Sequence, residues 1–193
     1  LAVAAGLAAG LWNGCLVAVL GIQPIVATLI LMTAGRGIAQ LITEGRILTF
    51  SDTGFGFLGS GSLFGIPVPA LLWILTAVLV ALLMRRTALG LLVEAVGINK
   101  RASALAGVNA RGLIIVVYMA SGLCAALAGI IATADIRGAD ANNAGLWLEL
   151  DAILAVVIGG NSLLGGRFSI AASVLGAMII QTIDTGILLA GFP

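Results

Sequence analysis

The sequence carries very little charge for its length. Charged residues make up only 9% of the 193 residues, histidine is absent, and lysine occurs once, at Lys100. A soluble domain has about 25% charged residues, so this chain lacks the means to keep a large surface hydrated. Because 61% of its residues are hydrophobic, we expect an integral membrane protein surrounded by lipid. Its net charge of +1 gives no indication of nucleic-acid binding.

The residue patterns that support catalysis are also missing. No G-x-x-x-x-G-K-[ST] sequence occurs, so the chain has no P-loop for ATP. Without histidine or a G-x-S-x-G elbow, neither triad chemistry nor an imidazole metal site is expected. Cys15 and Cys124 lie inside apolar runs, and the acidic pair Glu149 and Asp151 is better explained as a helix start. We therefore expect no catalytic residue, no metal site and no cofactor bound by this chain.

Apolar runs of membrane-spanning length are plentiful. A spanning helix needs about 20 mostly apolar residues, and a proline inside a helix interrupts it. We therefore expect an all-α polytopic transmembrane bundle of about six hydrophobic elements, two of them broken or short. The full-length runs cover residues 1–20, 67–84, 113–134 and 168–190. The broken element is interrupted at Pro24 and continues to residue 32. The short element covers residues 150–158 and ends at a glycine-rich break over residues 159–166.

The segments between these runs predict the rest of the organisation. Residues 36–66 are polar and glycine-rich and are expected to form a substantial loop, and residues 135–149 a second, acidic one. The chain begins at Leu1 and ends at Pro193, both within apolar sequence, so we expect a fragment of a longer protein. Its 193 residues should form a single transmembrane domain.

A glycine stripe in the first apolar run predicts close helix packing. Gly6, Gly10 and Gly14 repeat at four-residue spacing, which lets another backbone approach closely. The partner is either a second subunit or another helix of the same chain.

Residues 85–112 gather five of the nine Lys and Arg residues. With Arg167, six basic residues lie on one side of the membrane and three on the other, so the positive-inside rule places this segment in the cytoplasm. A connection between two helices needs only about five residues. The spacing of apolar residues predicts two short amphipathic pieces separated by a glycine. Such pieces lie either along the membrane surface or in the groove of a partner protein. The alternative is that the charges do no more than fix topology.

Three motifs resemble those of the ribose-type sugar ABC transporter permeases. Residues 94–108 resemble that family's cytoplasmic loop, A-x-G-G-N-x-x-A-A-x-x-S-G-I, with Ile98 and Ser103 departing from the pattern. Residues 149–166 resemble E-L-D-A-I-A-A-V-V-I-G-G followed by S-L-x-G-G, and residues 24–29 resemble P-F-I-x-T-L. Residues 120–145 look most like the galactofuranose branch of the family.

The resemblance implies a permease subunit that moves a monosaccharide, galactofuranose-like or ribose-like, across the bacterial inner membrane by alternating access. It also implies three partners: a cytoplasmic ABC ATPase that uses ATP and Mg, a second permease subunit, identical or homologous, and a periplasmic sugar-binding protein. Residues 85–112 would be the coupling loop that docks on the ATPase. The expected coupling residues are Glu94, Gly97, Asn99, Lys100, Arg101, Ala102, Ala106 and Gly107.

Four polar residues within apolar runs are candidates for the sugar path. They are Gln23, Thr28, Gln181 and Asp184. Asp184 is the most unusual, because an aspartate within a span costs about 2.5–3.5 kcal/mol on insertion scales. It either turns toward the path or makes an interhelical hydrogen bond.

Three other functions remain open on the residues alone. The broken helices at Pro24 and Gly159-Gly160 also suit a secondary transporter driven by an ion gradient. A membrane-embedded enzyme would need nucleophile or metal motifs that the sequence lacks. A purely structural subunit would tolerate changes at Gln181 and Asp184.

Overall fold

The computed structural model describes residues 1–63, 65–163 and 165–191. The structure is mostly helical, which confirms the predicted all-α polytopic membrane class. Among the described residues, four helices are long and apolar enough to cross a bilayer. Contacts divide the chain into unit 1, Leu1–Thr76 with Asn109–Ala144, and unit 2, Ala77–Val108 with Gly145–Pro193. The four spanning helices are α2 (Pro24–Thr43), α4 (Val68–Arg86), α7 (Ala110–Ile136) and α9 (Ile170–Leu189).

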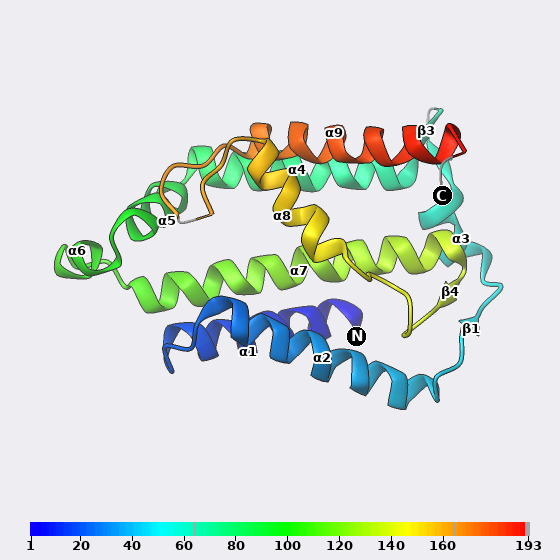
Figure 1. The fold of residues 1–193 in the computed structure, drawn as a ribbon, viewed down its shortest axis with the longest axis horizontal. Helices are drawn as coiled ribbons and strands as arrows, with labels where there is room; N and C mark the ends of the chain where they lie inside the picture. The colour runs from blue at the N-terminus through cyan, green and yellow to red at the C-terminus, as the bar shows by residue number, and fades with distance from the viewer. Residues whose placement is uncertain (64, 164, 192–193) are drawn as a thin grey trace. The chain divides into compact units, whose positions relative to one another are not determined.

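In unit 1, helix α1 (Ala2–Ala18) packs along α7, as Figure 1 shows. The glycine stripe forms the contact: a Cβ atom at Gly6 would lie 2.6 Å from Cβ of Ala126, and one at Gly14 would lie 2.9 Å from Cα of Ile115. The stripe therefore packs against a helix of the same chain. The predicted span over residues 1–20 is too long, because α1 has 17 residues and the chain leaves it before Gly21, whose φ is +70°.

Helix α2 begins at the predicted break. Pro24 occupies the first turn of α2, where its missing N–H removes no helical hydrogen bond. The prediction that a loop starts at residue 36 is wrong, because α2 continues to Thr43 and ends where Glu44 adopts a left-handed conformation with φ of 51°. A glycine within a helix costs only about 1 kcal/mol, whereas a lipid environment requires every backbone group to be bonded internally. The helix therefore runs through the glycine-rich residues 35–37.

Short elements follow α2 and α7 in unit 1. The β1 strand (Leu48–Thr49) pairs antiparallel with β4 (Gly138–Ala139), and β2 (Ser62–Leu63) pairs with β3 (Ile66–Pro67). Helix α3 (Thr53–Ser60) packs against α7. The segment predicted as loop after α2 is thus partly structured, although its strands are only two residues long.

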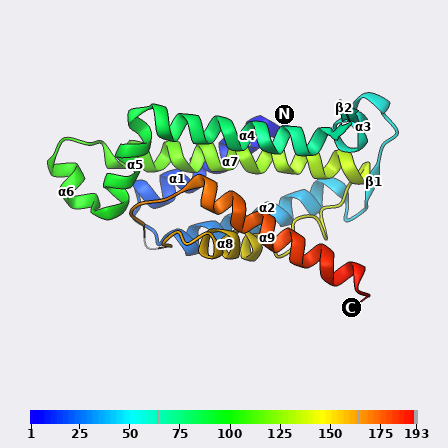
Figure 2. The ribbon, with the colours of Figure 1, turned by 90° about the horizontal axis from the view of Figure 1, so that it is seen from above.

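Unit 2 contains α5 (Ala88–Ile98), α6 (Lys100–Leu105), α8 (Leu148–Ile158) and α9. Helix α8 has 11 residues, about 16 Å of helix, which confirms that this element is too short to cross a bilayer about 30 Å thick. Glu149 and Asp151 lie in its first turn, as predicted for a helix start. Helices α8 and α9 pack together where Gly176 meets the backbone of Ala155 (Figure 2).

Candidate coupling site and solute path

The basic segment folds into the two short helices that its spacing predicts. Thr87 caps α5 by accepting a hydrogen bond from the N–H of Leu89 at 3.3 Å, and Asn99 caps α6 by accepting one from the N–H of Ala102 at 3.0 Å. The predicted separator is wrong in detail, since Gly97 lies inside α5 and the chain changes direction at Asn99. Asparagine is a favoured N-cap residue because its side-chain oxygen satisfies a free helical N–H. Gly107, with φ of +86°, follows α6 in the turn that leads to α7.

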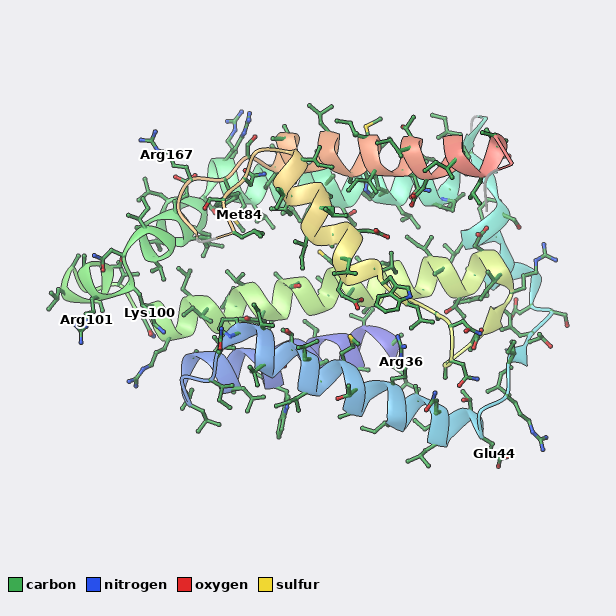
Figure 3. The ribbon with its side chains drawn as sticks, viewed as in Figure 1. Arg36, Glu44, Met84, Lys100, Arg101 and Arg167 are labelled. Carbon is green, nitrogen blue, oxygen red and sulfur yellow. The ribbon has the colours of Figure 1, made fainter. Side chains whose placement is uncertain are left out.

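Helix α6, the last residue of α5 and the C-cap of α6 together present what we call the α6 surface, made of exposed apolar and cationic side chains. Leu105 is 91% exposed and Ile98 is 69% exposed. Lys100 and Arg101 extend outward from α6 in Figure 3. Exposed large apolar residues beside cations are typical of a partner-binding surface. The α6 surface consists of Ile98, Lys100, Arg101, Ala102, Leu105 and Ala106.

Gly97 contacts a second segment, which we call the glycine loop (residues 159–163 and 165–169). A Cβ atom at Gly97 would lie 3.0 Å from the backbone nitrogen of Gly166, and one at Gly165 would lie 2.6 Å from the carbonyl oxygen of Gly97. Gly165 and Gly166 also have φ values of +93° and +104°, a region that favours glycine. Helix α5 and the glycine loop therefore meet backbone to backbone.

Asn161 fixes the glycine loop to the start of α9. Its Nδ2 donates hydrogen bonds to the carbonyl oxygen of Ser169 at 3.1 Å and to Oγ of Ser173 at 2.8 Å. Its Oδ1 accepts one from the N–H of Ser169 at 2.7 Å. The sequence alone predicts only a break between two helices here. The signal in the sequence that this loop is ordered is the two Gly-Gly pairs on either side of the four residues 161–164.

The structure separates the predicted coupling residues into distinct places. Lys100, Arg101, Ala102 and Ala106 contribute to the α6 surface. Glu94 instead lines a groove of about 360 Å³ next to Arg85 and Ser169. The other three residues shape the backbone. Asn99 caps α6, Gly97 makes the close contact with the glycine loop, and Gly107 forms the turn after α6.

The predicted path residues fall in both units. Gln23 and Thr28 belong to unit 1, whereas Gln181 and Asp184 lie exposed on α9 in unit 2. The Thr28 hydroxyl donates to the carbonyl oxygens of Pro24 and Ile25 at 3.1 and 3.0 Å. Within residues 1–63, 65–163 and 165–191, the carboxylate of Asp184 has no hydrogen-bond partner, so the interhelical bond, one of its two predicted alternatives, is not formed there.

Arg36 is the polar residue that our sequence interpretation missed. The sequence predicts a loop at this position, but Arg36 lies inside the spanning helix α2. The signal in the sequence is a single charged residue, between Gly35 and Gly37, within a 20-residue helix that is otherwise mostly apolar.

Comparison with known proteins supports a transport role for the chain. Residues 1–193 match the family model described as branched-chain amino acid transport system / permease component. The chain is 65% identical over 192 residues to the galactofuranose transporter permease protein YtfT of Escherichia coli (strain K12), covering 100% of this chain and 56% of the relative. No solved structure matches it.

Two further relatives are sugar import permeases. The chain is 45% identical over 195 residues to the fructose import permease protein FruF of Bifidobacterium longum, covering 99% of this chain and 55% of the relative. It is 39% identical over 181 residues to the ribose import permease protein RbsC of Bacillus subtilis, covering 93% and 56%. The chain thus spans little more than half the length of these relatives, and the predicted resemblance is confirmed. It belongs to the permease-component family of the branched-chain amino acid transport systems, within which it groups with ribose-type sugar permeases.

Proposed function

We propose that this chain is part of the membrane subunit of an ABC importer in the bacterial inner membrane, and that it carries a monosaccharide by alternating access. The three sugar permeases that it resembles support this substrate class, and the 65% identity to a galactofuranose permease favours galactofuranose among them. The chain itself breaks no bond. Hydrolysis of ATP with Mg belongs to a separate ATPase subunit.

The observation that carries the proposal is the α6 surface. It follows Arg85 and Arg86 at the C-terminal end of a spanning helix, where the positive-inside rule places the cytoplasm. Its exposed Leu105 and Ile98 offer an apolar area that a partner subunit would cover. An ATPase with an apolar groove and an acidic rim is the partner that this surface fits. Rim pairs at Lys100 and Arg101 would contribute about 0.2–1 kcal/mol each, so apolar contact carries most of the affinity.

The contact between Gly97 and the glycine loop supplies a route from the ATPase to the membrane. Movement of α6 moves α5, and α5 pushes on the backbone of Gly165 and Gly166. Asn161 ties that loop to the start of α9, so the displacement reaches α8 and α9. A backbone contact suits this role because it has no flexible side chain to absorb the motion.

The remaining partners follow from the same proposal. A second permease subunit completes the enclosed path, and a periplasmic sugar-binding protein delivers the sugar to the outer face. Binding within the path is weak, because a tightly held sugar could not leave it. Gln23, Thr28, Gln181 and Asp184 are candidates for contacts along this path.

Uptake by the full-length protein, reconstituted in proteoliposomes with its ATPase and binding protein, tests the proposal. We expect uptake of galactofuranose to require ATP on the ATPase side. Uptake should stop when the P-loop lysine of the ATPase is replaced, and should persist when ion gradients are collapsed. Uptake that continues without the ATPase and follows an ion gradient would contradict the proposal and identify a secondary transporter.

A further inference from the structure

Unit 1 contains a groove of about 610 Å³ between α2, the end of α7 and the loop that follows β4. Ligand pockets in proteins typically measure about 300–1,000 Å³. Its walls combine apolar side chains with hydroxyl groups and two opposite charges. The lining comes from Thr28, Leu31, Met32, Gly35, Arg36, Ala39, Thr43, Thr133, Ala139, Asp140, Ala141 and Ala144.

Arg36 is the cation of this groove. It lies seven residues before Thr43, the last residue of α2, and therefore about 10 Å inside the helix end. The residue is half-buried, and Figure 3 shows its side chain directed from α2 toward α7. Within the described residues the guanidinium has no hydrogen-bond or ion-pair partner. Its five N–H donors are thus free to bind a ligand, and a charge inside a spanning helix is costly unless it serves a function.

Asp140 provides the opposite charge. The side-chain amide of Asn143 donates to its Oδ2 at 2.8 Å and the N–H of Asn142 donates to its Oδ1 at 2.9 Å. These hydrogen bonds, first that of the Asn143 side chain, lower the pKa of the Asp140 carboxyl below its ordinary value. The group is therefore an anion, able to accept hydrogen bonds, at neutral pH. Arg36 and Asp140 line the same groove without forming an ion pair.

Two side-chain hydrogen bonds hold the loop that carries Asp140 against α2. Gln40 Nε2 donates to Asn142 Oδ1 at 2.9 Å, and Asn142 Nδ2 donates to the carbonyl oxygen of Gly45 at 3.0 Å. The β1–β4 pairing, with Leu48 opposite Ala139, fixes the same loop from its other side. The position of the acceptor relative to Arg36 is therefore set by the fold rather than by a flexible loop.

We propose that this groove is a binding site for a neutral polyhydroxylated solute, a monosaccharide, on the outer half of the path. Arg36 donates to hydroxyl oxygens of the ligand, and Asp140 accepts from its hydroxyl groups. The two charges cancel, which disfavours an anionic or a cationic solute. Leu31 and Met32 offer apolar surface to the C–H groups of a sugar ring. The site deepens the proposed function and rests on it.

The variant R36Q tests the site in the full-length transporter, reconstituted with its ATPase and binding protein. We expect its KM for uptake of galactofuranose, or of ribose or fructose if one of these is the better substrate, to rise about tenfold. The matched control is R46Q, which removes the same charge from an exposed position after the end of α2. It should leave KM unchanged.

A second measurement tests the groove without changing Arg36. Cys15 and Cys124 are replaced by alanine and Ala141 by cysteine, so that a thiol reagent reports on the groove lining. The transported sugar should slow labelling of A141C in the wild-type background more than in R36Q. An unchanged KM in R36Q, or labelling that is insensitive to sugar, would overturn the site. If R36Q fails to insert while A141C is not protected, another segment of the full-length chain fills the groove, and the site is likewise wrong. Absence of ATP-driven sugar uptake by the wild type would instead refute the proposed function.

Discussion

Replacing Gly122 by leucine is expected to prevent the full-length protein from folding stably. In α7 a Cβ atom at this position would overlap the carbonyl oxygen of Gly6 and lie 3.1 Å from Cα of Gly10. Overpacking a core costs about 1–3 kcal/mol and occasionally more, and here backbone atoms cannot rotate away. We expect α1 and α7 to separate, at a cost of about 3 kcal/mol or more, which is over a hundredfold in the folding equilibrium. Size-exclusion chromatography of the detergent-solubilised protein measures the remaining folded fraction.

Gly129 provides the matched control, because it lies on the same helix, seven residues further on. A Cβ atom at Gly129 would have no neighbour within 4 Å, so G129L should give a nearly normal folded fraction. Equal yields of folded protein from G122L and G129L would show that the contact between α1 and α7 is not formed by these glycines.

The second large effect is expected from replacing Gly97 by leucine. The new side chain would press on the backbone of Gly166, 3.0 Å from the Cβ position, and displace the glycine loop. We expect membrane insertion to stay normal while sugar-stimulated ATP hydrolysis falls at least about fivefold, since coupling free energies of 1–3 kcal/mol correspond to 5–150-fold effects. Phosphate release by the reconstituted full transporter, with and without sugar, measures this directly.

The control for G97L is G186L. Gly186 lies in α9 of the same unit, and a Cβ atom there would meet nothing within 4 Å. G186L should retain sugar-stimulated hydrolysis. Unchanged coupling in G97L would mean that motion of α5 does not pass through the glycine loop.

Much of this fold was predictable because lipid imposes simple rules. Apolar length predicted the spans at α4, α7 and α9, and Pro24 predicted the start of α2. The charge pattern and the apolar spacing of residues 85–112 predicted two short helices, now α5 and α6. The glycine stripe predicted a close helix contact, although the sequence alone left its partner open.

The errors have physical causes. The end of α2 was predicted too early, because the composition of residues 35–37, two glycines and an arginine, is typical of a loop. In lipid, however, every backbone group must be hydrogen-bonded internally, which keeps this segment helical. The contact of Gly97 with Gly165 joins residues 68 positions apart, which local periodicity does not encode. Arg36 and Asp140 come to one groove through the hydrogen bonds of Asn142 and through the pairing of β1 with β4, two strands too short to recognise in sequence.

Site-specific photocrosslinking from position 105 tests the central claim most directly. Leu105, the most exposed apolar side chain of α6, is replaced by a photoreactive phenylalanine analogue in the assembled transporter. If the α6 surface is the docking site, irradiation should join this chain to the ATPase subunit. Crosslinks to the periplasmic binding protein, or none to the ATPase in an assembled complex that still hydrolyses ATP, would contradict the account.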